Sequence, residues 1–213
     1  MMGFRLDIPR IDEQIYQDIM GNIEFILLNP TTGGKYTGMS DDVHASRALH
    51  WLLQIDSTSS YPVRIATYGH DIERAVAPAI NPNKYINDTK YRQAHSMRSA
   101  DIIGQLLYPY QCRKKISFSD TDLIKRLVLN HEIGGINDVC GGQADKVRDS
   151  DTLANFEWAD SEPVWQSYPH RKLKSMLKRK YDLLLPQHRK FVQDIDLEHS
   201  LIIKWIESWV NQS

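Results

Sequence analysis

The chain has 213 residues, of which 41% are hydrophobic and 25% are charged. This composition is typical of a globular protein and excludes a disordered, fibrous or membrane-embedded one. The 26 Lys and Arg residues balance 27 Asp and Glu residues to a formal net charge of −1, so no overall basic field attracts nucleic acid or an anionic membrane.

The first residues, MMGFRLDIPRIDEQ, contain acids and a proline where a secretory signal needs an uninterrupted apolar stretch. The aliphatic run Phe25–Leu28 is far too short to span a bilayer. We therefore expect a cytoplasmic protein that has no membrane partner.

Hydrophobic residues recur with helical spacing almost throughout the chain, and no segment alternates strictly as a strand does. This pattern predicts an all-α fold, with residues 1–213 forming a single-domain helical bundle. Ser40-Asp41 and Ser119-Asp120 stand where side chains can cap the second and fifth helices. In chain order, we place the helices at about 10–28, 41–56, 62–77, 89–108, 119–132, 142–158, 170–184, 187–194 and 197–210.

Several predicted helices carry a histidine or an acid on a stripe that otherwise faces the interior. In the second helix, His44 shares its stripe with Ala48 and Trp51, and in the sixth helix Asp151 lies in the middle of a similar stripe. Taken alone, any one of these histidines is best read as a hydrogen-bonded core residue. Together they favour a shared metal ion. The other members of this set are His70, Asp71, His95 and His131.

The carboxylates narrow the choice of ligands. An ionised carboxylate in an apolar interior is heavily penalised, so Asp151 must be neutralised, hydrogen-bonded or bound to a cation. Adjacent helix positions are about 100° apart, so His70 and Asp71 can both reach an ion over the arc between them. Asp149 and Asp151 are about 200° apart and are not expected to bind one ion together. We favour Asp151, and leave Asp149 as a residue behind the ligands or a surface charge.

These residues carry a resemblance to a known family. His44 in VHASR, His70-Asp71 in YGHDIER and Asp151 in DSDTLANFE occur in the order of the H…HD…D signature. This set resembles the HD superfamily of metal-dependent phosphohydrolases over residues 41–158, between flanking helices in 1–40 and 159–213. The resemblance implies an all-helical HD-type fold with one divalent ion bound by these four residues. Members of the family mostly cleave phosphoester bonds, often in nucleotides.

Some members of this family have further histidines between the HD pair and the last Asp, which hold a second ion or contact phosphate. His95 and His131 occupy such positions. The chain has Asn130-His131 where the binuclear cyclic-dinucleotide branch has paired histidines. Imidazole and carboxylate ligands suit Mn, Fe, Co, Ni or Zn better than Mg, and the ligand set selects neither a single metal nor one ion over two.

The expected function is hydrolysis of a phosphoester of a nucleotide or similar small phosphorylated metabolite, by water that the ion activates. Monoester and diester substrates are equally compatible. Arg47, Arg74 and Arg98 can neutralise charge on the phosphate, and Glu73 can shuttle a proton, although each also suits an exposed helix surface. The rival hypothesis is a regulatory module that binds metal and nucleotide without turnover.

The C-terminal part has its own features. His170–Lys180, HRKLKSMLKRK, reads as a solvated basic face or as a phosphate-steering patch, and the net charge argues against nucleic acid as a partner. Trp205 and Trp209 suit either the core or a homodimer surface. We treat the remaining histidines as ordinary: His50, His170, His188 and His199.

Overall fold

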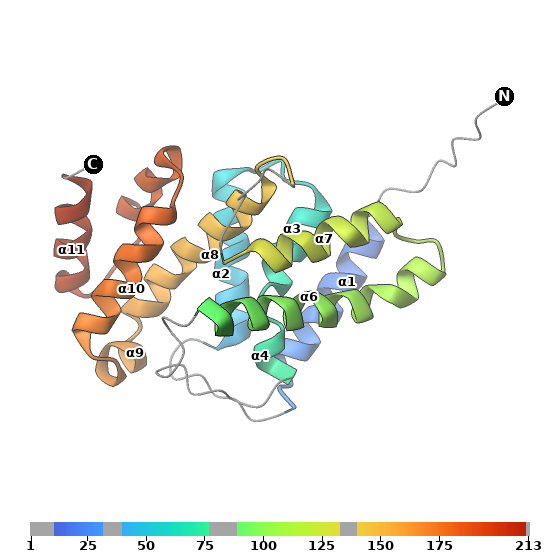
Figure 1. Cartoon of the computed structure of the whole chain (residues 1–213), viewed down its shortest axis with the longest axis horizontal. Coiled ribbons are helices and arrows are strands. Elements are labelled where there is room, and N and C mark those ends of the chain that lie inside the picture. Colours follow the sequence, from blue (N-terminus) through green and yellow to red (C-terminus); the bar gives the residue numbers. More distant parts are fainter. Residues whose placement is uncertain (1–10, 32–39, 77–88, 133–139, 212–213) are drawn as a thin grey trace.

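The computed structural model describes residues 11–31, 40–76, 89–132 and 140–211, and every regular element in them is helical (Figure 1). This confirms the all-α fold expected from the hydrophobic spacing. No described helix combines the length and apolar character that crossing a bilayer requires. The elements are α1 (Glu13–Leu28), α2 (Asp41–Ile55), α3 (Tyr61–Gly69), α4 (Glu73–Val76), α6 (Thr89–Cys112), α7 (Phe118–Asn130), α8 (Gln143–Asp160), α9 (Glu162–Ser167), α10 (His170–Leu183), the 3-10 helix η1 (Pro186–Gln193) and α11 (Ser200–Val210).

The third predicted helix, 62–77, is wrong in one respect, because the chain leaves the helix at His70. Here α3 ends, and two short-range backbone bonds, Ile72 N to Gly69 O (3.2 Å) and Arg74 N to Asp71 O (2.9 Å), form the turn into α4. Apolar spacing continues through this turn, so it gave no sign of the break. His70 and Asp71 therefore lie at a helix end.

The N-terminus of α7 also differs slightly from expectation. The cap is Ser117, whose side chain accepts a hydrogen bond from Asp120 N at 2.9 Å, and Ser119 lies inside the first turn. Ser40 precedes α2 as predicted, but its side chain makes no capping bond. Both helices nevertheless begin within two residues of the expected positions.

Two hydrophobic clusters form the core. The first joins α1, α3, α6 and α7 and includes the fully buried Ile19, Ile65 and Ile103. The second joins the last turns of α8 to the C-terminal helices and includes Trp205 and Trp209, which are buried here. Figure 1 places α10 and α11 at one end and α1, α6 and α7 at the other, with α2 and α8 between them. Because α2 and α8 contribute to both clusters, they connect the two parts.

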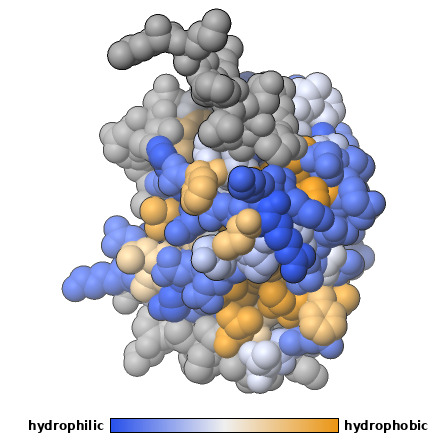
Figure 2. Space-filling view, turned by 90° about the vertical axis from the view of Figure 1, so that its right-hand side faces the viewer, coloured by the Kyte–Doolittle hydropathy of each residue, from blue (hydrophilic) through white to orange (hydrophobic). Residues whose placement is uncertain are grey.

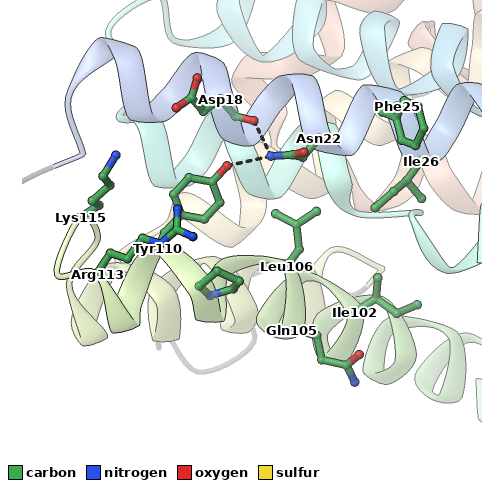
Figure 3. A pocket seen from close by; sticks show the side chains of 11 residues that line it. Asp18, Asn22, Phe25, Ile26, Ile102, Gln105, Leu106, Tyr110, Arg113 and Lys115 are labelled. Carbon is green, nitrogen blue, oxygen red and sulfur yellow. Dashed lines mark hydrogen bonds between the residues drawn. The ribbon is translucent and has the colours of Figure 1, made fainter.

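One end of the molecule carries a surface groove that lies apart from the interior site described below. On the end of the molecule that carries α1, α6 and α7, hydrophilic and hydrophobic side chains are interspersed (Figure 2). An open groove runs between α1 and α6 (Figure 3). Helix α6 contains Pro109 and continues beyond it. Across the groove, Asn22 Nδ2 donates a hydrogen bond to the Tyr110 hydroxyl at 2.7 Å. None of the predicted site residues lines this groove.

Candidate metal centre

Four predicted ligands meet in the interior: His44 from α2, His70 and Asp71 from the turn after α3, and Asp151 from α8. One nitrogen or oxygen atom of each lies within 4.8 Å of the corresponding atoms of the others. The four residues are 1–5% exposed. The sequence order H…HD…D therefore corresponds to one buried cluster.

The two carboxylates face the same pair of imidazoles. His44 Nε2 lies 3.1 Å from Asp151 Oδ1 and 3.7 Å from Asp71 Oδ2. His70 Nε2 lies 3.3 Å from Asp151 Oδ1 and 3.4 Å from Asp71 Oδ2. Two nitrogens and two oxygens thus surround one small volume between three segments of the chain.

Helix ends orient two of the histidines. His70 caps α3, and its Nδ1 lies 2.7 Å from the Thr67 carbonyl oxygen. His131 caps α7 in the same way, with Nδ1 2.6 Å from the Val128 carbonyl oxygen. Because a carbonyl only accepts, Nδ1 carries the proton in both rings. Nε2 is therefore directed inward as the potential ligand atom, which is how metal-binding histidines are commonly held.

A second group of potential ligands shares Asp71 with the first. Asp71 Oδ1 lies 2.6 Å from His95 Nε2 and 3.7 Å from His131 Nε2, and these three residues also meet the spacing of a metal site. Asp71 thus presents Oδ2 to one pair of histidines and Oδ1 to another. The predicted proximity of His95 and His131 to the four ligands agrees with this arrangement.

Glu73, the first residue of α4, is buried behind His95. Its Oε2 lies 2.7 Å from His95 Nδ1, and its Oε1 accepts from Arg98 Nε at 2.6 Å. Burial raises the pKa of Glu73, but His95 and Arg98 outweigh it and lower that pKa overall. A continuous chain of hydrogen bonds therefore links Asp71, His95, Glu73 and Arg98.

The two carboxylates create a negative electrostatic potential at His70. Burial alone would lower the pKa of His70, yet Asp71 and Asp151 raise it to about 10. Burial would raise the pKa of Asp151, but Lys180 and the two histidines hold it well below its usual range. A site that stabilises a buried imidazolium in this way also favours a metal cation in its place.

The pKa of His131 shifts in the opposite direction to that of His70. Burial and the positive charge of His70 lower the pKa of His131 to about 4. The ring is therefore neutral at physiological pH, with a lone pair on the inward Nε2.

The three predicted arginines occupy different places. Arg74 forms an ion pair with Asp71, and Arg98 pairs with Glu73, so both adjoin the cluster. The Arg47 side chain is 53% exposed, and its Nε lies 3.4 Å from Glu157. Arg47 lies one turn after His44 on α2, but its side chain points toward Glu157. Within the described residues, Arg47 contacts none of the four predicted ligands.

Asp149 and Asp151 have different partners. Asp151 belongs to the cluster, whereas Asp149 is fully buried on another side of α8. Asp149 accepts from Arg148 (2.6 Å to Nη2), and its Oδ2 lies 2.6 Å from His188 Nδ1. Asp149 is therefore not a surface charge, and His188, taken as ordinary from the sequence, is its buried partner.

Lys180 was not identified as a site residue from the sequence. Its Nζ donates to Asp151 Oδ2 at 2.9 Å, and its side chain is 11% exposed. The expectation of a solvated face is wrong for this residue, because Lys180 follows Leu173, Met176 and Leu177 at helical spacing and these side chains are buried. That i, i+3, i+4, i+7 spacing was the available signal.

Comparison with protein families, curated proteins and solved structures found no match to this chain. Function is therefore inferred from the residues themselves.

Proposed function

We propose that this protein is a metal-dependent phosphohydrolase of the HD type, which acts on a phosphoester of a nucleotide or similar small metabolite. The supporting observation is the convergence of His44, His70, Asp71 and Asp151, which are spread over 107 positions of the sequence, in one buried cluster. Their order in the chain is that of the HD superfamily signature.

The donor set fits a divalent cation. His70 Nε2 is buried and lies 3.3 and 3.4 Å from two carboxylate oxygens, but it makes no well-directed hydrogen bond to either, and such incomplete pairing of a buried polar atom is costly. An ion would satisfy this nitrogen and compensate two buried carboxylates at the same time. Two imidazole nitrogens with two carboxylate oxygens suit Mn, Fe, Co, Ni or Zn, and Mg less well.

When bound, such an ion supplies an acidified water and polarises a phosphoryl oxygen. The chain's own groups have complementary roles. The Thr67 carbonyl keeps the His70 ring in its tautomer, and Glu73 keeps His95 against Asp71. Arg74 and Arg98 adjoin the cluster, where guanidinium groups stabilise charge that develops on a phosphate.

The second group of ligands bears on the alternative roles of His95 and His131. With its Nδ1 proton bound to Val128, His131 presents a lone pair inward and has no inward N–H to offer a phosphate. His95 has both ring nitrogens against carboxylates. This favours a second cation beside Asp71 Oδ1 over direct contact between these histidines and phosphate.

The test is reconstitution of metal-depleted protein. Mn²⁺, Co²⁺, Ni²⁺ or Mg²⁺ should restore hydrolysis of nucleotides or p-nitrophenyl phosphate. His70→Ala and Asp71→Ala should lose more than about 100-fold in activity, because even residues behind metal ligands contribute about 10- to 100-fold. His50→Ala, an exposed position on α2, is the matched control. Turnover that persists in His70→Ala overturns the proposal, and tight metal binding without turnover identifies the regulatory module instead.

A further inference from the structure

Lys180 brings a charge from the C-terminal helices into the metal centre. It lies on α10, outside residues 41–158 that carry the HD resemblance, and it is 9% exposed. Its Nζ lies 2.9 Å from Asp151 Oδ2, and an adjacent carboxylate favours the charged form of a buried lysine. A buried ammonium ion therefore stands beside a predicted metal ligand.

The hydrogen-bonding capacity of this ammonium is only partly used. An ammonium group has three N–H donors. Within the described ranges of the chain, Asp151 Oδ2 is the one acceptor in contact with Lys180 Nζ. Buried donors that lack acceptors are costly, and those of charged groups cost most. The two remaining donors are therefore suited to the oxygens of an anionic ligand.

The position of Lys180 relative to the ion site follows from the two oxygens of Asp151. Oδ1 faces His44 and His70, and Oδ2 faces Lys180. A divalent ion held by His44, His70 and Asp151 would take up much of the negative charge of Asp151, so the Lys180 ammonium would lose part of its charge compensation. An anion that binds beside the ion would restore the charge compensation of Lys180.

We propose that Lys180 is a substrate-binding residue, which donates hydrogen bonds to a phosphoryl oxygen of the ligand at the metal centre. This inference rests on the proposed function, and it makes α10 part of the substrate site. The ligand class is a phosphate ester whose phosphoryl group lies within reach of both the ion and the ammonium.

A purely structural role for Lys180, in which it only holds Asp151 in place, predicts a different result. Loss of such a support should weaken metal binding by about 10- to 100-fold. In our proposal, removal of the positive charge leaves metal affinity unchanged or raises it, because charge repulsion with the ion disappears. Phosphate affinity should fall instead.

The experiment compares Lys180→Met and Lys180→Arg with wild type, and Lys172→Met removes the same charge from an exposed position of α10. Calorimetry measures Mn²⁺ affinity first and then the affinity of the Mn²⁺-loaded protein for inorganic phosphate. We expect Lys180→Met to bind Mn²⁺ at least as tightly as wild type and phosphate about 10- to 100-fold more weakly, as for a lost hydrogen bond to a charged group. Lys180→Arg and Lys172→Met should stay close to wild type.

The outcomes separate this inference from the proposed function. Wild type that binds no metal ion overturns both. Metal binding with equal phosphate affinity in wild type and Lys180→Met overturns the role of Lys180 alone, as does a loss of metal affinity in Lys180→Met. If that variant does not fold, NMR of the Zn²⁺-loaded wild type decides: the Lys180 ammonium resonance should shift on addition of phosphate, and an unchanged resonance overturns the inference.

Discussion

His70 and His131 occupy equivalent places in two different helices. Each is the C-cap of its helix, each ring bonds through Nδ1 to the carbonyl three residues earlier, and the two ring centroids lie 4.9 Å apart. A backbone carbonyl in the last turn of α3 and of α7 thus orients each ring. The rings face different oxygens of Asp71, Oδ2 for His70 and Oδ1 for His131.

This pairing predicts how metal content responds to substitution. His131→Ala should reduce the bound metal from two ions to one, because it removes a ligand of the second group only. Asp71→Ala should reduce binding at both positions, since both groups share this carboxylate. Elemental analysis of the purified variants measures the number of metal ions per protein molecule. Equal metal content in wild type and His131→Ala would show that the second group holds no ion.

Substitution of Asp149 should affect the stability of the fold, whereas substitution of Asp151 should affect metal binding. Asp149→Ala removes the buried carboxylate that faces both Arg148 and His188, and loss of one member of a buried pair costs about 3–5 kcal/mol. Asp151→Asn should instead lose metal affinity. Urea unfolding and metal titration of both variants measure the two effects. A large loss of metal affinity in Asp149→Ala that is still folded would contradict the assignment.

The contact of α3 with α6 predicts a packing effect at Gly69. A Cβ atom there would lie 2.6 Å from Ile103 Cδ1, and Ile103 is fully buried. Gly69→Ala should therefore destabilise the protein by about 1–3 kcal/mol through overpacking. Gly21→Ala on α1, where no atom lies within 4 Å of the added carbon, should stabilise it by roughly 0.5–1 kcal/mol. Thermal unfolding of the two variants should show shifts of opposite sign.

The ion pair between Asp56 and Lys146 predicts a pH dependence of stability. It joins the C-terminal end of α2 to α8 at 2.7 Å, and bonds from Lys146 and Thr58 lower the pKa of Asp56 from 3.8 to about 2. Because the pKa is lower in the folded state, the stabilisation is present above about pH 4 and is lost as the pH falls toward 2.

Asp56→Asn should lower the free energy of unfolding at neutral pH, by a small amount since the pair is partly exposed. Its difference from wild type should shrink between about pH 4 and pH 2. Denaturant titrations across this range measure both quantities, and the exposed Asp196→Asn controls for removal of an acidic charge. A difference that is constant with pH would contradict the assigned pair.

Much of the site could be predicted because it lies on regular helices. His44 precedes apolar residues at helical spacing, and His131 and Asp151 follow them, and that spacing alone places all three inside. The break at His70 could not be predicted, since the apolar pattern continues across it. What joins the residues into one cluster is tertiary packing, which no local pattern specifies.

Charge was a weak guide to the position of two side chains. Arg47 was placed near the phosphate because it follows His44 by one turn, but rotation about α2 directs it toward Glu157. Lys180 was grouped with a basic run, although its spacing to Leu177 and Leu173 is that of a buried stripe. In a segment so rich in cations, composition concealed a residue whose charge is turned inward.

Tyr181, the residue after Lys180, links α10 to a tryptophan whose fluorescence can be measured. Tyr181 packs against Trp209 of α11, with ring centroids 5.7 Å apart, and both side chains are buried. Any shift of α10 that accompanies ligand binding changes the surroundings of that indole. Intrinsic fluorescence would report such a shift in unlabelled protein.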